Sequence, residues 1–216
     1  MQTIRELIFI LDASGSMSDL VTDTIGGFNQ MLERQHDRLD ETYVTTVTFN
    51  HKVKTLYSFK PLEGVEPLST NTYEVGGMTA LYDAIGETIV RVYRKQQHRQ
   101  RENTITSTLV VIMTDGMENS SSRYTQSSVQ NHIETLKRDH DWEFIFLGAN
   151  IDAKHVASDL GIAPDRASSY HADAKGTKLN YATLERTVRA FRTEGRINDN
   201  WQEDIDADYL KRQKKS

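Results

Sequence analysis

Short, continuous apolar runs alternate with longer amphipathic stretches along this chain. Residues 7–11, 109–113 and 144–147 are the apolar runs, and such runs are typical of strands buried on both faces of a parallel sheet. Between them, hydrophobic residues recur at helical spacing on one face. They are Val21, Ile25, Phe28 and Leu32; Leu81, Ile85, Ile89 and Val92; Val129, Ile133 and Leu136; and Leu184, Val188 and Phe191. This alternation predicts an α/β fold, with a doubly wound, mostly parallel sheet flanked by helices on both faces.

One pair of strands is expected to be antiparallel. In residues 43–49, Tyr43, Thr45, Val47 and Phe49 alternate with smaller or polar residues, and residues 51–59 follow almost at once. Because so short a link allows only a hairpin, the two strands must run in opposite directions. Lys52, Lys54 and Lys60 share one parity of the second strand. Lysines there protect an exposed sheet edge from pairing with other chains, which predicts an antiparallel edge strand.

The composition suits one domain with a sizeable core. The chain has 216 residues and a formal net charge of -5, which argues against a nucleic-acid binder with a broad basic face. The absence of cysteine excludes disulfides and thiolate zinc sites. The start of the chain resembles neither a signal peptide nor a membrane span. We therefore expect a cytoplasmic protein without a membrane partner, with a domain at residues 1–195 and a C-terminal extension with a basic end at 196–216.

Three turns that are distant in sequence carry hard oxygen ligands. Asp12, Ser14 and Ser16 directly follow the first apolar run. Thr79 follows a long loop rich in glycine and proline, and Asp115 closes the apolar run that begins at residue 109. In an open α/β sheet, ligands bind beyond the carboxyl ends of strands where the strand order reverses. If the turns meet there, their hydroxyls and carboxylates suit Mg²⁺ or Mn²⁺.

This order of turns resembles the von Willebrand factor A domain family with its metal-ion-dependent adhesion site. That family has Asp-x-Ser-x-Ser, then a Thr after a glycine-rich loop, then an Asp at the end of a later strand. The similarity runs from about Ile4 to about Phe191, and its later part is similar to small stand-alone bacterial and phage members. The resemblance implies a Rossmann-like fold and a metal site at Asp12, Ser14, Ser16, Thr79 and Asp115.

Each turn also has a plainer interpretation. Ser16 or Ser18 could cap the first helix, Thr79 could cap the helix that begins near residue 80, and Asp115 could belong to an ordinary turn. Together these interpretations must explain three matches in the right order, which favours the metal site. We expect the hydroxyls of Ser14 and Ser16 to be exposed, outside the core.

Neighbouring residues leave further alternatives open. Met17, Met78 and Met117 each adjoin one of the site residues. They could form an adaptable apolar rim that packs on a partner, or fill gaps beneath the loops. Glu118 could orient a metal-bound water or attract a basic partner.

The leading functional hypothesis is a non-enzymatic protein-binding module that depends on Mg²⁺ or Mn²⁺. A protein partner would offer an Asp or Glu to the ion, and the resemblance suggests an AAA+ ATPase or a subunit of a multi-protein assembly. One alternative is a metal-dependent hydrolase or phosphatase, for which Asp83 or Glu118 are the local candidate bases. Another is a scaffold whose metal is structural.

Overall fold

The computed structural model describes residues 2–36, 41–99 and 104–214 and contains a six-stranded sheet. The strands are β1 (Gln2–Asp12), β2 (Thr42–Phe49), β3 (Val53–Pro61), β4 (Thr104–Thr114), β5 (Glu143–Ala149) and β6 (Ala167–Tyr170). The α-helices are α1 (Val21–Glu33), α2 (Leu81–Arg99), α3 (Gln126–His140), α4 (Ala153–Asp159), α5 (Ala174–Glu194) and α6 (Glu203–Gln213). Short 3-10 helices lie at η1 (Gly15–Leu20), η2 (Leu62–Gly64) and η4 (Pro164–Arg166).

The strand order is β3-β2-β1-β4-β5-β6, and it reverses at β1. β1 pairs in parallel with β2 on one side and with β4 on the other, where Leu11 lies opposite Met113. Only the β2–β3 pair is antiparallel among the described strands. The predicted fold class is therefore confirmed. The carboxyl ends of β1 and β4 are neighbours, at the reversal point where such folds bind ligands.

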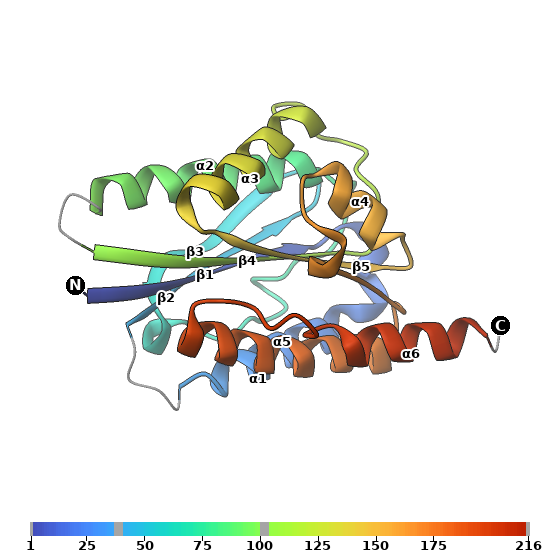
Figure 1. Ribbon diagram of the computed structural model, residues 1–216. Coiled ribbons are helices and arrows are strands. Elements are labelled where there is room, and N and C mark those ends of the chain that lie inside the picture. Colours follow the sequence, from blue (N-terminus) through green and yellow to red (C-terminus); the bar gives the residue numbers. More distant parts are fainter. Residues whose placement is uncertain (1, 37–40, 100–103, 215–216) are drawn as a thin grey trace.

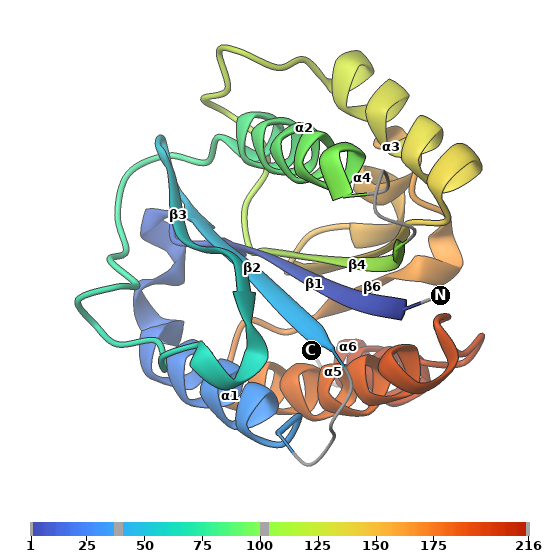
Figure 2. The same cartoon turned by 90° about the vertical axis from the view of Figure 1, so that its left-hand side faces the viewer.

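Helices cover both faces of the sheet. α2, α3 and α4 form the upper layer in Figure 1, and α1, α5 and α6 form the lower layer; Figure 2 shows the same layers from the amino end of β1. Each face of the sheet packs against its helices in a separate hydrophobic core. Successive side chains of β1 alternate between them, with Leu7 and Phe9 in the lower core and Ile8 and Ile10 in the upper one. Because side chains alternate across a strand, a strand that is buried on both faces reads as a continuous apolar run.

β3 is an edge strand, as predicted. It begins at Val53, so Lys52 lies in the turn before it. Lys54 pairs with Glu74 and Lys60 with Glu66, and all four side chains reach the surface. The edge is thus lined by charged side chains that hinder pairing with another chain.

Three elements near the end of the chain are not foreseen from the sequence: β6, α4 and α6. β6 contains Ser168 and Ser169, and the Ser168 hydroxyl donates to Asp206 of α6 at 2.5 Å. α6 packs on β6 and α5, and Trp201 and Ile205 join the lower core. No helix in the described part of the chain is long and apolar enough to cross a membrane.

The loop after β4 is fastened to the first turn of α2. The backbone N–H of Tyr82 donates to Glu118 at 2.9 Å, and that of Asp83 donates to the Ser121 hydroxyl at 3.0 Å. Glu118 also accepts from the backbone N–H groups of Ser120 and Ser121. A helix leaves its first N–H groups without intrahelical acceptors, and here side chains of a distant loop accept two of them.

Asp83 makes the reciprocal contact. Its carboxylate accepts hydrogen bonds of 2.8–3.0 Å from the backbone N–H groups of Ser122, Arg123 and Tyr124. Burial by itself would raise the pKa of Asp83, but these N–H groups and the Arg123 guanidinium outweigh it and hold the pKa below its usual value. The ionised carboxylate therefore stabilises the folded loop.

We expect Asp83→Asn to lower the free energy of unfolding at neutral pH by about 1–3 kcal/mol, because the amide is a weaker acceptor for three N–H groups. The wild-type carboxylate contributes fully above its unfolded pKa of about 4, and the contribution is lost as the pH falls through the lower folded pKa. The difference between wild type and variant should therefore shrink in acid. Urea unfolding at neutral and acidic pH measures it. The exposed Asp199→Asn is the control, and a difference that does not depend on pH would contradict the assignment.

Two adjacent glycines of α1 provide a second, matched test. A Cβ at Gly27 would lie 2.2 Å from the Tyr181 ring of α5, whereas a Cβ at Gly26 would have no neighbour within 4 Å. Gly27→Ala should lower the free energy of unfolding by about 1–3 kcal/mol through overpacking. Gly26→Ala should raise it by up to about 1 kcal/mol, because alanine is the better helix former. Equal effects of both changes on denaturant unfolding would show that close α1–α5 packing is not the reason.

Candidate metal centre

Asp12 is the last residue of β1, and both of its carboxylate oxygens accept hydrogen bonds. Oδ1 accepts from the backbone N–H of Ser14 at 2.7 Å, and Oδ2 from the Thr114 hydroxyl at 2.5 Å. The Tyr73 hydroxyl donates to the backbone oxygen of Asp12. Asp12 is only 1% exposed. Its carboxylate is therefore fixed in direction, at the point where β1 and β4 end together.

The other four site residues lie near one another at the same end of the sheet. The Ser16 hydroxyl donates to Asp115 Oδ1 at 2.6 Å and lies 3.1 Å from the Ser14 hydroxyl. A Cβ built on Gly116 would lie 3.1 Å from Thr79 Oγ1 and 3.8 Å from Ser16 Oγ. The hydroxyls of Ser16 and Thr79 thus approach Gly116 together. The structure brings all five of the residues expected from the sequence to one end of the sheet.

Backbone hydrogen bonds join the three turns. The N–H of Gly15 donates to the oxygen of Gly77 at 3.0 Å. The N–H of Thr79 donates to Asn119 Oδ1 at 2.8 Å, and the Asn119 N–H donates back to the Thr79 oxygen at 3.0 Å. Gly77 has a φ of +79°, and a Cβ there would lie 2.3 Å from His51 Nδ1. This position therefore requires glycine for both conformation and space.

The two carboxylates lack a cationic partner. Burial raises the pKa of Asp12, against hydrogen bonds from Thr114 and Ser14, and Asp115 raises it further. Burial also raises the pKa of Asp115, against hydrogen bonds from Ser16 and Ser14. Within the described residues, no lysine, arginine or histidine contributes to either shift. Because a buried carboxylate such as that of Asp12 is normally paired or bound to metal, the donor set fits a divalent cation.

The donor set is rich in hydroxyls. Across residues 2–36, 41–99 and 104–214, no group of three or more His, Cys, Asp or Glu side chains could hold a metal. A cation here would therefore depend on Ser14, Ser16 and Thr79 beside two carboxylates. Hydroxyl and carboxylate oxygens are hard ligands, which suit Mg²⁺ and Mn²⁺.

Ser14 differs from expectation. It is 2% exposed, whereas the sequence led us to expect both serines at the surface; only Ser16 is exposed. Backbone hydrogen bonds from Gly15 to Gly77 and from Gly76 to Ala13 hold the Gly76-Gly77 segment against the turn that contains Ser14. The Ser18 hydroxyl donates to the Gly15 oxygen at 2.6 Å, so it stays within its own turn.

The methionines divide between the two interpretations. Met17 is 4% exposed, as the gap-filling interpretation requires, whereas Met78 and Met117 are 56% and 69% exposed, as a rim would be. Glu118 takes a role that was not foreseen, because it is engaged by the loop and by α2. Sequence reasoning also missed Thr114, although it directly precedes Asp115 in a strand paired with β1.

Comparison with known proteins identifies a matching family and several solved structures with a similar fold. The profile of the von Willebrand factor type A domain matches residues 6–183. Proximal thread matrix protein 1 from the mussel byssus, in a structure with a zinc-occupied MIDAS motif, has 13% identity and a TM-score of 0.62, over 87% of this chain and 46% of that one. The von Willebrand factor type A protein from Catenulispora acidiphila has 14% identity and a TM-score of 0.55, over 86% and 42%.

A third structure, the ArnB paralogue VWA2 from Sulfolobus acidocaldarius, has 15% identity and a TM-score of 0.53, over 87% of this chain and 45% of that one. This chain therefore spans less than half the length of each of these proteins. A comparison with curated proteins found no match. At such low identities the solved structures show a shared fold, and the profile, which covers most of the chain, shows that this protein belongs to the von Willebrand factor type A domain family.

Proposed function

We propose that this protein is a binding module that captures a protein partner through a divalent cation. The hydroxyls of Ser14, Ser16 and Thr79 and the carboxylates of Asp12 and Asp115 would hold Mg²⁺ or Mn²⁺. The observation that carries the proposal is the meeting of these oxygens around two carboxylates that have no cationic neighbour in the described structure. The bound cation would supply an electrophilic centre for an anionic ligand.

The chemistry of the donors favours an anionic ligand from outside. Three neutral hydroxyls neutralise less of the ion's charge than a cage of carboxylates would. Ser16 is exposed and Asp115 half-exposed, so the site opens to solvent on that side. An Asp or Glu side chain of the partner fits there, and Met78 and Met117 offer adaptable apolar contact around it.

The family supports this proposal in general terms. Von Willebrand factor A domains are generally protein-interaction modules, and the mussel protein of the same fold holds zinc at its MIDAS motif. We propose that the partner is a protein that presents an acidic side chain, such as an AAA+ ATPase or an assembly subunit.

An enzymatic role has less support. A metal-dependent hydrolase needs a general base near a metal-bound water. The local acidic candidates, Asp83 and Glu118, are both occupied by backbone N–H groups. Their lone pairs hold the loop after β4 in place, which leaves them poorly suited to accept a proton from water.

The combined change Ser14→Ala and Ser16→Ala should weaken Mn²⁺ affinity by more than about tenfold. It should lower the free energy of unfolding by only about 1 kcal/mol, because each hydroxyl makes few hydrogen bonds. Calorimetric titration with Mn²⁺ and urea unfolding measure the two effects. Ser18→Ala, in the same turn, is the matched control and should bind Mn²⁺ as the wild type does. Unchanged affinity in the double variant would refute the assignment.

Asp115→Ala should weaken capture of a protein partner more than it weakens folding. Asp115 lies half-exposed at the open side of the site and contacts Ser16 rather than the core. A pull-down in Mg²⁺, repeated with EDTA and with the folded variant, measures capture. If EDTA unfolds the protein, the metal is structural; if the variant retains the full amount of partner, the proposed site is wrong.

A further inference from the structure

A hollow of about 550 Å³ adjoins the candidate metal centre. Residues 50–54, from the turn between β2 and β3, form one wall, and residues 74–76 and Ala13 form the other. Ala13 belongs to the Asp12–Ser16 turn, and Gly76 leads towards Thr79. The hollow, called here the hairpin groove, is therefore continuous with the two turns that would hold the cation.

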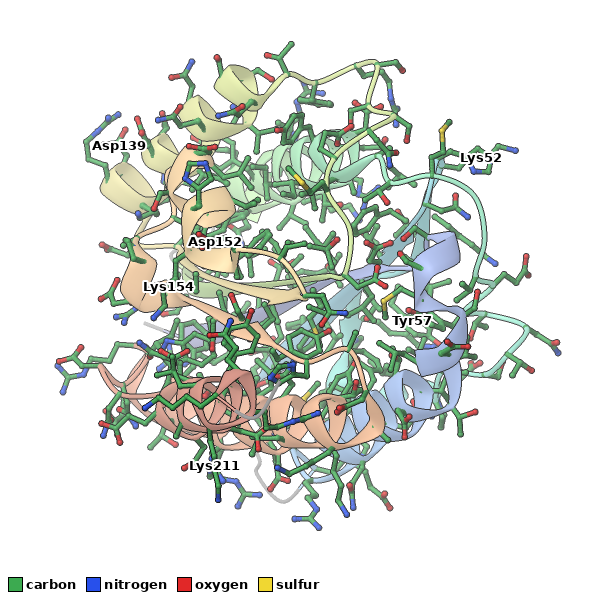
Figure 3. All side chains as sticks on the ribbon, turned by 90° about the vertical axis from the view of Figure 1, so that its right-hand side faces the viewer. Lys52, Tyr57, Asp139, Asp152, Lys154 and Lys211 are labelled. Atoms are coloured by element: carbon green, nitrogen blue, oxygen red, sulfur yellow. The ribbon has the colours of Figure 1, made fainter. Side chains whose placement is uncertain are left out.

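The hairpin groove is lined by basic side chains. His51, Lys52 and Lys54 all contribute to its wall. Lys52 is exposed and forms no ion pair with the part of the chain that the structure describes. In Figure 3, which faces the carboxyl ends of the parallel strands, Lys52 projects outward at one margin of the molecule.

Lys54 has only a weak partner. Its amine lies 3.5 Å from Glu74, and the two side chains are 52% and 72% exposed. Exposed ion pairs of this kind contribute little free energy, because water and salt screen them. An incoming carboxylate can therefore replace Glu74 at small cost.

The segment that follows the Asp12–Ser16 turn carries two acidic side chains. Asp19, in η1, is exposed, and Asp23, in the first turn of α1, is half-exposed. The whole chain has a net charge of -5, so its overall charge does not attract an acidic partner. Lys52 and Lys54 give the hairpin groove local positive charge beside the centre, and this charge attracts acidic groups.

We propose that the hairpin groove receives a second acidic residue of the partner, next in the chain to the one that binds the cation. This proposal rests on the proposed function of the metal centre. The partner segment is then an extended acidic peptide that runs from the cation towards Lys52 and Lys54. The two lysines of the hairpin groove therefore favour a ligand that carries its second acidic residue on that side.

The test uses synthetic fluorescein-labelled peptides that share one central Glu. In one peptide the flanking residues are Gly and Ser; in others a pair of Asp or a pair of Lys replaces them on one side. Fluorescence anisotropy measures binding to the full chain in Mn²⁺ and in EDTA. The variants are Lys52→Glu with Lys54→Glu, the charge-matched control Lys178→Glu with Lys211→Glu, and Glu74→Gln. Lys178 lies on α5, and Lys211 lies far from Lys52 in Figure 3.

In Mn²⁺, the Asp-flanked peptide should bind about threefold to tenfold more tightly than the neutral one. The Lys52→Glu and Lys54→Glu variant should lose this preference and favour the Lys-flanked peptide, while its affinity for Mn²⁺ alone stays close to wild type. Glu74→Gln should strengthen binding of the Asp-flanked peptide, and the control variant should keep the wild-type preference. High salt should reduce every one of these differences.

The outcomes separate this inference from the proposed function. Mn²⁺-dependent binding of all peptides with equal affinity would contradict the proposed role of the hairpin groove, and it would still support the proposed metal-dependent function. Binding of the Asp-flanked peptide that EDTA does not reduce would overturn the metal-dependent function, and with it this inference. Absence of binding by any peptide at about 1 mM would also overturn the inference, because a cation and two lysines should give a stronger complex.

Discussion

The hydrogen bond from Ser16 to Asp115 joins two turns that are 99 residues apart in the chain, and it links the turn after β1 directly to the turn after β4. The bond can form because the strand order reverses at β1, which places the carboxyl end of β1 beside that of β4. A hydroxyl that donates to a carboxylate leaves its own lone pairs free. The contact therefore holds the two side chains together without adding positive charge.

The two carboxylates of the centre have no positively charged partner among the described residues. Isolated carboxylates are costly to bury, and here the compensation within the chain comes from hydroxyls and from one backbone N–H at Asp12. Serine and threonine hydroxyls are weaker partners than a guanidinium or an ammonium group. The negative charge of Asp12 and Asp115 is therefore not neutralised by a positive side chain, and an external cation is suited to neutralise it.

The sequence is a good guide wherever a pattern is local. The apolar runs predict β1, β4 and β5 because alternate side chains of each strand enter two separate cores. Asp12 and Asp115 stand out because each follows such a run. β6 cannot be recognised from an apolar run, because the side chains of Ser168 and Ser169 form hydrogen bonds. The roles of Glu118 and Asp83 and the burial of Ser14 follow from contacts between distant loops, and these leave no periodic signal.

The bonds between the loop after β4 and the first turn of α2 have a consequence for ligand capture. Asp83 and Glu118 immobilise that loop during folding, and Asn119 fixes it to Thr79. The conformational entropy of the loop, about 1–2 kcal/mol for each ordered residue, is therefore lost before any ligand arrives. Association needs little further ordering at this rim, so the centre is preorganised, and even a small contact area can yield useful affinity.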